Sequence, residues 1–136
     1  MGVFKDASDA EDFLGGIFEK AMEIPALADE LASSGVVLRI GYSDPDSQIT
    51  VDMPNKKVFK GANDLTPGVE LFMTADMGNK FWLGNINLPI AMAKGQVRAK
   101  GPVPKVLKLI PVSKQLFPYY AEMLEERGRN DLIAAG

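Results

Sequence analysis

Apolar residues recur at helical spacing near the start of the chain, at Phe13, Leu14, Ile17, Phe18 and Met22. Ser8 is followed three residues later by Glu11, which fits a capping box, so we expect this helix to begin at Ser8. The pair Gly15-Gly16 in its middle indicates that one face packs closely against another element. Pro25 then begins a second short helix, which ends at residues 33–35.

Between residues 36 and 76 the pattern changes to period two, which is typical of strands with one buried face. The alternating apolar positions are Val36, Leu38, Ile40 and Tyr42, then Ile49, Val51 and Met53. The turn residues Asp44-Pro45-Asp46 lie between these two runs and predict a hairpin. A short third strand is expected at Val58–Phe59 and a fourth at Glu70–Asp76, with Phe72 on one of its faces.

The segment from residue 77 to residue 93 is different, because it has helical spacing without a polar face. Its apolar residues are Met77, Phe81, Trp82, Leu83, Ile86, Leu88, Ile90 and Met92. Two short helices are expected, at Asn79–Leu83 and Leu88–Lys94, with Pro89 in the first turn of the second. A helix pair that is apolar all round must be covered on several sides, so this segment is either central core or the wall of a ligand cavity.

The last third of the chain predicts one more strand and two more helices. Gly95 and Gly101 bracket a fifth strand, Gln96–Lys100. The helix that starts at Pro102 has its apolar residues at Val103, Val106, Leu107 and Ile110. We expect Pro111 to break it and a final helix, with Phe117 and Tyr120, to be kinked or restarted at Pro118. Residues 130–136 are expected to be a tail, so that residues 1–136 form a single domain ending in the helix and tail of residues 110–136.

Composition removes several classes of function. The 136 residues include no Cys and no His. The sequence therefore has no disulfide, no thiolate or imidazole metal ligand and no Ser–His or Cys–His catalytic group. We expect no metal and no cofactor, and a protein that is not an enzyme.

Charge is unevenly distributed along the chain. The net charge is −3, yet residues 77–121 contain seven basic residues and no acidic one. Such a surface either attracts anionic head groups or is a solvated face whose charges share a sign. The helix with Lys105 and Lys108 likewise either caps a core or touches an anionic membrane. Aromatic residues do not interleave with the basic ones beyond Phe81 and Trp82, so nucleic-acid binding is not expected.

Candidate catalytic groups are few. Asp52 and Asp76 fall on predicted strands and could form a carboxylate pair, but the alternation puts both on the more polar face, where we expect them to be solvated. Tyr119 or Tyr120 could donate its hydroxyl into a cavity or pack at the margin of the core.

No targeting segment is recognisable. Residues 1–12 lack the basic and apolar regions of a secretory signal, and the longest apolar stretch, Phe81–Ala93, is too short to span a bilayer. We expect a soluble cytoplasmic protein.

Three segments together resemble the sterol carrier protein type 2 family. They are Phe81-Trp82-Leu83-Gly84, the run from Lys94 to Gly101 (KGQVRAKG) and Val106-Leu107-Lys108-Leu109. The order of the predicted elements also matches, and the resemblance covers about residues 10–117. It departs at Pro102-Val103-Pro104, where relatives carry a polar residue, and the final Ala134-Ala135-Gly136 is not a peroxisomal signal.

The resemblance implies an α+β fold in which a five-stranded sheet and helices enclose a hydrophobic tunnel. It also implies binding of fatty acids, fatty acyl-CoA, sterols or phospholipids without catalysis. By the same resemblance, Trp82, Leu83, Ile86, Ile90, Val97 and Leu107 would line the cavity, with Gln96 as the polar candidate. Apolar positions of the adjoining elements complete the set of candidate ligand-binding residues: Phe72, Phe81, Leu88, Met92, Val106, Ile110, Phe117 and Tyr120.

The leading hypothesis is therefore a non-catalytic carrier of a lipid or another apolar small molecule, with transient membrane contact through Lys105 and Lys108. The alternative is a small enzyme or accessory subunit that acts on a steroid or an acyl thioester. A third possibility is an interaction module whose apolar segment docks a partner.

Overall fold

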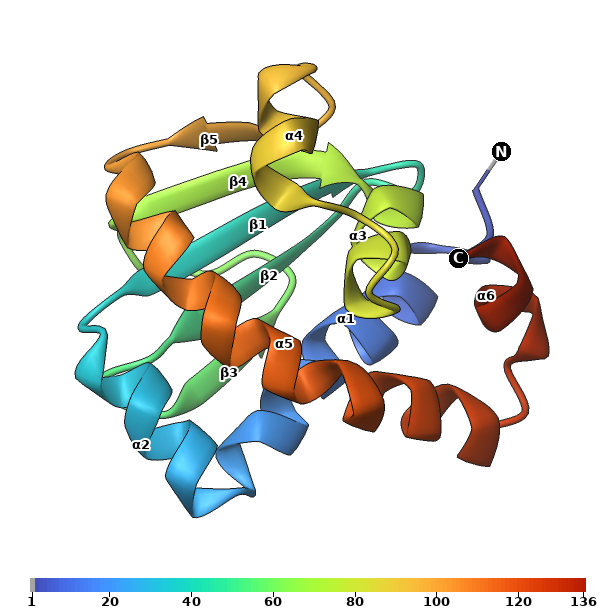
Figure 1. Cartoon of the computed structure of the whole chain (residues 1–136), viewed down its shortest axis with the longest axis horizontal. Helices are drawn as coiled ribbons and strands as arrows, with labels where there is room; N and C mark the ends of the chain where they lie inside the picture. Colours follow the sequence, from blue (N-terminus) through green and yellow to red (C-terminus); the bar gives the residue numbers. More distant parts are fainter. Residues whose placement is uncertain (1) are drawn as a thin grey trace.

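The computed structural model describes residues 2–136, which form six helices and five strands (Figure 1). Their order is α1 (Ala7–Met22), α2 (Pro25–Ser33), β1 (Val37–Ser43), β2 (Ser47–Asp52), β3 (Lys57–Lys60), β4 (Val69–Thr74), α3 (Ala75–Trp82), α4 (Leu88–Ala93), β5 (Arg98–Lys100), α5 (Val103–Glu126) and α6 (Asn130–Ala135). The predicted α+β class and the predicted five-stranded sheet are confirmed.

The five strands form one mixed sheet in the order β3-β2-β1-β4-β5. β1 pairs antiparallel with β2 across the predicted turn at Asp44-Pro45-Asp46 and parallel with β4 on its other side. Two parallel strands cannot be joined by a tight turn, because the chain must first return to the end of the sheet where it began. Between β1 and β4 the chain therefore forms β2, β3 and the loop of residues 61–68.

One face of the sheet, the inner face, is covered by helices. Leu38, Ile40 and Tyr42 of β1 are buried and alternate with partly exposed neighbours, as the period-two pattern predicts. Figure 1 shows α5 running across the front of the sheet between α2 and α4. α1 packs on β2 at Gly15, where a Cβ would lie 2.8 Å from Cδ1 of Ile49, so the close contact expected at this glycine is present.

The opposite, outer face is crossed by the loop between β3 and β4. The Arg39 guanidinium donates hydrogen bonds to Thr50 Oγ1, to Asn63 Oδ1 at 3.0 Å and to the Leu65 carbonyl at 2.7 Å. This cover buries Thr50 completely, although it faces away from the core. Asp52 is buried as well and accepts a hydrogen bond from Asn55, so the expectation of a solvated Asp52 is wrong.

Two helices begin at other residues than predicted. The N-cap of α1 is Asp6, whose carboxylate accepts a hydrogen bond from the backbone N–H of Asp9, and Ser8 lies inside the first turn. The fourth strand ends at Thr74, because the Thr74 hydroxyl caps α3 by accepting from the Met77 N–H. Asp76 is therefore helical, and its assignment to a strand is wrong.

α5 continues through both prolines, and the break predicted at Pro111 is wrong. Each proline removes one backbone donor, which leaves the carbonyls of Leu107 and Lys114 without their helical partners. Both of those residues are exposed, so water can hydrogen-bond the freed carbonyls and the helix bends instead of ending. Figure 1 shows α5 changing direction near its middle.

The last residues are folded, and the prediction of a tail at residues 130–136 is wrong. Residues 130–135 form α6, and the Leu132 side chain is completely buried. Periodicity could not indicate this helix, because its six residues are too few to establish a pattern.

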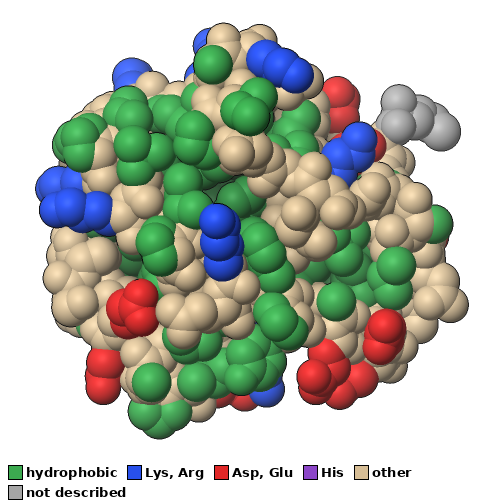
Figure 2. All heavy atoms as spheres, viewed as in Figure 1, with side chains coloured by type: hydrophobic (Ala, Val, Ile, Leu, Met, Phe, Trp, Pro, Cys, Tyr) green, Lys and Arg blue, Asp and Glu red, His purple; other side chains and the backbone are tan. Residues whose placement is uncertain are grey.

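Figure 2 shows hydrophobic side chains gathered on the helical side of the molecule around a hollow, with isolated basic side chains among them. None of the helices in residues 2–136 combines the length and the hydropathy that a membrane crossing requires.

Candidate functional site

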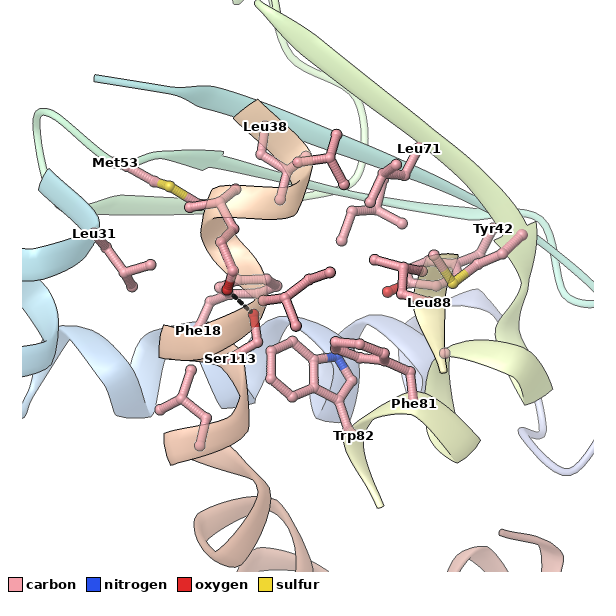
Figure 3. Close-up of a pocket in the computed structure, with 17 residues that line it drawn as sticks. Phe18, Leu31, Leu38, Tyr42, Met53, Leu71, Phe81, Trp82, Leu88 and Ser113 are labelled. Atoms are coloured by element: carbon pink, nitrogen blue, oxygen red, sulfur yellow. Dashed lines mark hydrogen bonds between the residues drawn. The ribbon is translucent and has the colours of Figure 1, made fainter. Parts of the chain in front are cut away.

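An apolar cavity of about 50 Å³, here called the inner cavity, lies between the inner face of the sheet and the helices (Figure 3). Its walls come from β1, β4 and every helix from α1 to α5. The lining residues are Phe18, Leu31, Leu38, Ile40, Tyr42, Met53, Leu71, Met73, Gly78, Phe81, Trp82, Leu88, Val106, Leu109, Ile110, Ser113 and Leu116.

The inner cavity has no charged side chain in its lining. Its polar side-chain groups are the hydroxyls of Tyr42 and Ser113 and the indole N–H of Trp82. The Ser113 hydroxyl is used within α5, where it donates to the Leu109 carbonyl at 2.7 Å. Burial raises the pKa of the Tyr42 phenol well above its ordinary value, so this group stays neutral. The lining thus favours an apolar occupant held by shape and dispersion.

A larger pocket of about 510 Å³, the outer pocket, opens at the surface beside the inner cavity. It is lined by Phe81, Gly84, Asn85, Ile86, Asn87, Leu88, Pro89, Ile110, Lys114 and Phe117. Phe81, Leu88 and Ile110 line both spaces and form the partition between them. Small-molecule sites usually measure about 300–1,000 Å³, so the inner cavity alone is too small for a lipid, whereas the two spaces together are not.

Aromatic rings form the wall on the α3 side. Phe81 meets both Trp82 and Phe117 edge to face, at centroid distances of 5.1 and 5.4 Å, and Trp82 meets Phe18 at 5.3 Å. Gly78 lets α3 approach β1, because a Cβ there would lie 2.7 Å from the Tyr42 ring.

No protein-family model matches this sequence, and no curated protein sequence matches it either. Solved structures do match it. The apo form of sterol carrier protein 2 from Yarrowia lipolytica superposes with a TM-score of 0.65 at 17% identity, over 84% of this chain and 96% of that chain. The solution structure of the sterol carrier protein domain 2 of Helicoverpa armigera has a TM-score of 0.62 at 18% identity, over 79% of this chain and 91% of that one.

The chain has the sterol carrier protein 2 fold. The resemblance noted in the sequence is thereby confirmed at the level of the fold. A third structure, sterol carrier protein 2 from Aedes aegypti in complex with palmitate, has a TM-score of 0.57 at 18% identity, over 76% of this chain and 94% of that chain.

Within this sterol carrier protein 2 fold, the candidate residues predicted from sequence lie in three kinds of place. Those that line the inner cavity are Phe81, Trp82, Leu88, Val106 and Ile110. Ile86 and Phe117 line the outer pocket only. Val97 and Tyr120 are buried in the core, Leu83 and Met92 pack at its margin, and Ile90 and Leu107 face solvent, with 53% and 42% of their surface exposed.

Phe72 and Gln96 lie elsewhere. Phe72 alternates with Leu71 and Met73, which face the inner cavity, so it points to the outer face of the sheet. There it shares a shallow pocket with Gln96 and Arg98, whose guanidinium lies 5.6 Å from the ring centroid.

Sheet residues supply much of the cavity lining, and the candidate set lacked them. Leu38, Ile40, Leu71 and Met73 had a signal in the sequence, because the period-two pattern put them on the buried faces of their strands. Nothing in the pattern indicated that the helices above these strands leave space.

The carboxylates considered for catalysis do not come together. Asp52 is opposite Val37 at the start of β1, whereas Asp76 follows Thr74, which pairs with Ser43 at the other end of β1. Asp76 accepts a hydrogen bond from the Val3 N–H at 3.0 Å. Among residues 2–136 no group of three His, Cys, Asp or Glu side chains is placed to hold a metal ion.

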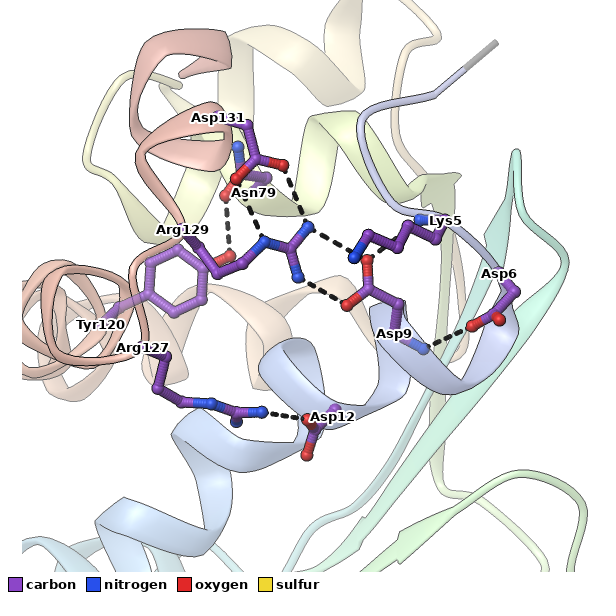
Figure 4. A network of polar contacts seen from close by, with 9 residues as sticks. All are labelled: Lys5, Asp6, Asp9, Asp12, Asn79, Tyr120, Arg127, Arg129 and Asp131. Carbon is purple, nitrogen blue, oxygen red and sulfur yellow. Dashed lines mark hydrogen bonds and ion pairs between the residues drawn. The ribbon is translucent and has the colours of Figure 1, made fainter.

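Tyr120 is part of a buried polar chain outside the cavity (Figure 4). Its hydroxyl donates to Asn79 Oδ1 at 2.7 Å, and Asn79 Nδ2 donates to the Leu132 carbonyl at 2.8 Å. Asn79 and Tyr120 are both completely buried, and burial raises the pKa of Tyr120 far above its ordinary value. The chain joins α3, α5 and α6, so its role is structural.

Arg129 ties α6 to α1 beside this chain of hydrogen bonds (Figure 4). Its guanidinium donates two hydrogen bonds to Asp9, at 2.6 and 3.1 Å, and two to Asp131, at 3.1 and 3.0 Å. Burial is the largest single influence on Asp9 and would raise its pKa, but the hydrogen bonds from Arg129 and from the Lys5 N–H, together with the positive charges of both residues, lower the pKa on balance. The hydrogen bond from Arg129 also lowers the pKa of Asp131.

We predict that Arg129→Gln lowers the free energy of unfolding by about 1–3 kcal/mol at pH 7, because it leaves a partly buried carboxylate without its partner. Both carboxyl pKa values are depressed in the folded state, so the stabilisation is present above the unfolded pKa and is lost as the pH falls through the folded one. The difference between wild type and variant should therefore stay constant from about pH 5 to 8 and shrink below about pH 4.

Urea unfolding at a series of pH values measures this difference. The matched control is Arg127→Gln, since Arg127 makes an exposed ion pair with Asp12 at 2.6 Å. Arg127→Gln should lower the free energy of unfolding by less than about 1 kcal/mol. An equal cost for the two variants would contradict the role given to Arg129.

Proposed function

We propose that this chain is a cytoplasmic, non-catalytic carrier that binds a lipid in the inner cavity and outer pocket and transfers it. Long-chain fatty acid, fatty acyl-CoA, sterol and phospholipid are the candidate ligands. The observation that carries the proposal is the uncharged inner cavity, which adjoins a pocket large enough for a ligand. A palmitate complex among the structural neighbours is consistent with it.

Binding requires the inner cavity to expand, and α4 is the element most suited to move. It is the one helix within residues 2–136 that has no extensive contact with any single other element. Elements with few buried contacts open at the lowest cost in free energy. Leu88, the first residue of α4, belongs to the partition, so a shift of this helix would join the two spaces.

The gain from burying an acyl chain is large enough to drive this movement. Each methylene that leaves water contributes about 0.8 kcal/mol, so ten methylenes contribute about 8 kcal/mol before the costs of binding and opening. A site of this kind needs no catalytic group.

We predict that lipid co-purifies with the chain and that added lipid displaces a fluorescent fatty acid. Mass spectrometry of an organic extract identifies the bound species. Trp82 is the only tryptophan and lines the inner cavity, so its fluorescence reports binding directly. If no lipid is extracted and none of the fluorescent probe is displaced, the proposed function is wrong.

We predict that Ser113→Phe weakens fatty acid binding at least about tenfold, because the ring occupies the cavity that the acyl chain would fill. Ser113→Ala is the matched control: it removes the same hydroxyl, whose partner lies in its own helix, but adds no volume. It should bind within about twofold of wild type. Titration of Trp82 fluorescence measures both, with thermal unfolding as the check on folding. Equal binding by the two variants would place the ligand elsewhere.

We further propose that the chain touches anionic membranes through α4 and the start of α5. Ile90, Val103 and Leu107 are exposed apolar residues in this region, with Lys105 and Lys108 exposed beside them. None of the basic residues of the segment 77–121 forms an ion pair with the described residues. Free lysines beside exposed apolar side chains suit a surface of anionic head groups.

We predict that Lys105→Ala/Lys108→Ala lowers binding to phosphatidylserine-containing vesicles at least about tenfold at low salt, at about 1 kcal/mol for each lysine. Wild-type binding should fall steeply as salt is added. Vesicle co-sedimentation measures both effects, with Lys20→Ala/Lys57→Ala as the control that removes two exposed charges elsewhere. If the binding of the wild-type chain to vesicles does not change with salt concentration, the membrane proposal is refuted.

A further inference from the structure

We infer that the outer pocket binds the anionic head group of the ligand, a carboxylate, and that Lys114 is its partner. The acyl chain then passes between Phe81, Leu88 and Ile110 into the inner cavity. This inference rests on the proposed function and deepens it, because it assigns an orientation and a head-group class to the lipid.

The two faces of α5 separate the polar end of the site from the apolar one. Ile110, Lys114 and Phe117 follow at spacings of four and three residues, so they lie along one side of the helix and line the outer pocket. Leu109, Ser113 and Leu116 lie on the adjoining side and line the inner cavity. Ile110 is the residue common to both sides.

Lys114 is an unusual member of this lining. It is the one charged residue in the outer pocket, whose other members are apolar residues, glycine and two asparagines. Within residues 2–136 its ammonium makes no ion pair, and no acidic residue occurs between positions 77 and 121 to provide one nearby in the sequence. A lone cation at the mouth of an apolar site favours the end of a ligand that carries the opposite charge.

The two asparagines add neutral donors. Asn87 uses its Oδ1 to accept from the Ile90 N–H at 3.1 Å, which leaves its amide N–H groups for another partner. Asn85 is exposed on the same loop. A carboxylate accepts hydrogen bonds both from an ammonium such as that of Lys114 and from amide N–H groups. A hydrocarbon end would leave these donors without a partner.

The packing around the pocket positions the charge at its rim. Gly84 has a φ of +81°, and a Cβ there would lie 3.2 Å from the Phe117 ring, so the loop closes tightly on this aromatic side chain. Phe117 in turn meets Phe81, one of the three partition residues. The floor of the outer pocket is thus aromatic and the cation stands beside it, which matches a ligand with one charged and one apolar end.

The test compares three probes with the same sixteen-carbon chain: hexadecanoate, hexadecyl phosphate and hexadecan-1-ol. Each is titrated into the full chain, without vesicles, with Trp82 fluorescence as the readout. We expect Lys114→Ala to weaken hexadecanoate binding about fivefold and Lys114→Glu to weaken it further. Hexadecan-1-ol should bind both variants within about twofold of wild type, because it has no charge for Lys114 to meet.

Lys80→Ala is the control, since Lys80 is an exposed lysine of α3 that lines neither space. It should leave the binding of all three probes unchanged. The wild-type preference for hexadecanoate over the alcohol should shrink as salt is added. If Lys114→Ala weakens the binding of hexadecyl phosphate more than that of hexadecanoate, the site prefers a phosphate and the assignment to a carboxylate is overturned.

The inference fails alone if wild type and Lys114→Ala bind hexadecanoate equally while the alcohol still binds. It fails together with the proposed function if none of the three probes binds the wild-type chain.

Discussion

The apolar inner face of β1 must be kept from water, and the remainder of the structure depends on how this is done. β1 is the central strand, with an antiparallel partner on one side and a parallel one on the other, so it is covered on both edges and needs covering on both faces. The loop held by Arg39 covers the outer face. Helices from the start, middle and end of the chain cover the inner one, and they leave the inner cavity because they do not meet completely over it.

The cover is firmly attached at α1, α3 and α6 and lightly at α4. Around α1, α3 and α6, Arg129 binds two aspartates, and Asn79 links Tyr120 to the Leu132 carbonyl. By contrast, α4 has no extensive contact with any single element of residues 2–136 and carries exposed Ile90. The proposed entry of a lipid depends on this difference in packing, since a uniformly packed cover would have no element that opens at low cost.

Local patterns predicted the fold well, and they predicted the candidate site only in part. Alternation identified the buried faces of β1 and β4, and helical spacing identified α1 and the first half of α5, because each pattern repeats over several residues. The apolar segment of residues 77–93 contains Phe81, Trp82 and Leu88, which line the inner cavity. It could not separate them from Ile90, because which side of a six-residue helix is covered depends on tertiary packing.

Errors at the ends of elements had a different cause. Asp6 and Thr74 cap their helices through single hydrogen bonds, and several nearby residues could have done the same. The buried Asn79–Tyr120 pair joins residues 41 positions apart, and no feature of either residue's neighbours in the sequence indicates the other. Contacts of this range become visible only when the chain has folded.

The bend of α5 has a mechanical consequence. Pro111 and Pro118 remove two backbone hydrogen bonds within two turns, so the helix flexes there more easily than anywhere else along its length. Beyond this region, Tyr120 and Leu124 are buried, and Tyr120 is hydrogen-bonded to α3. Before it lie Val106 and Leu109, which face the inner cavity. The C-terminal half of α5 is therefore held by its buried contacts, whereas the N-terminal half can bend at the prolines. Bending of this kind would change the volume of the inner cavity without disturbing the C-terminal half.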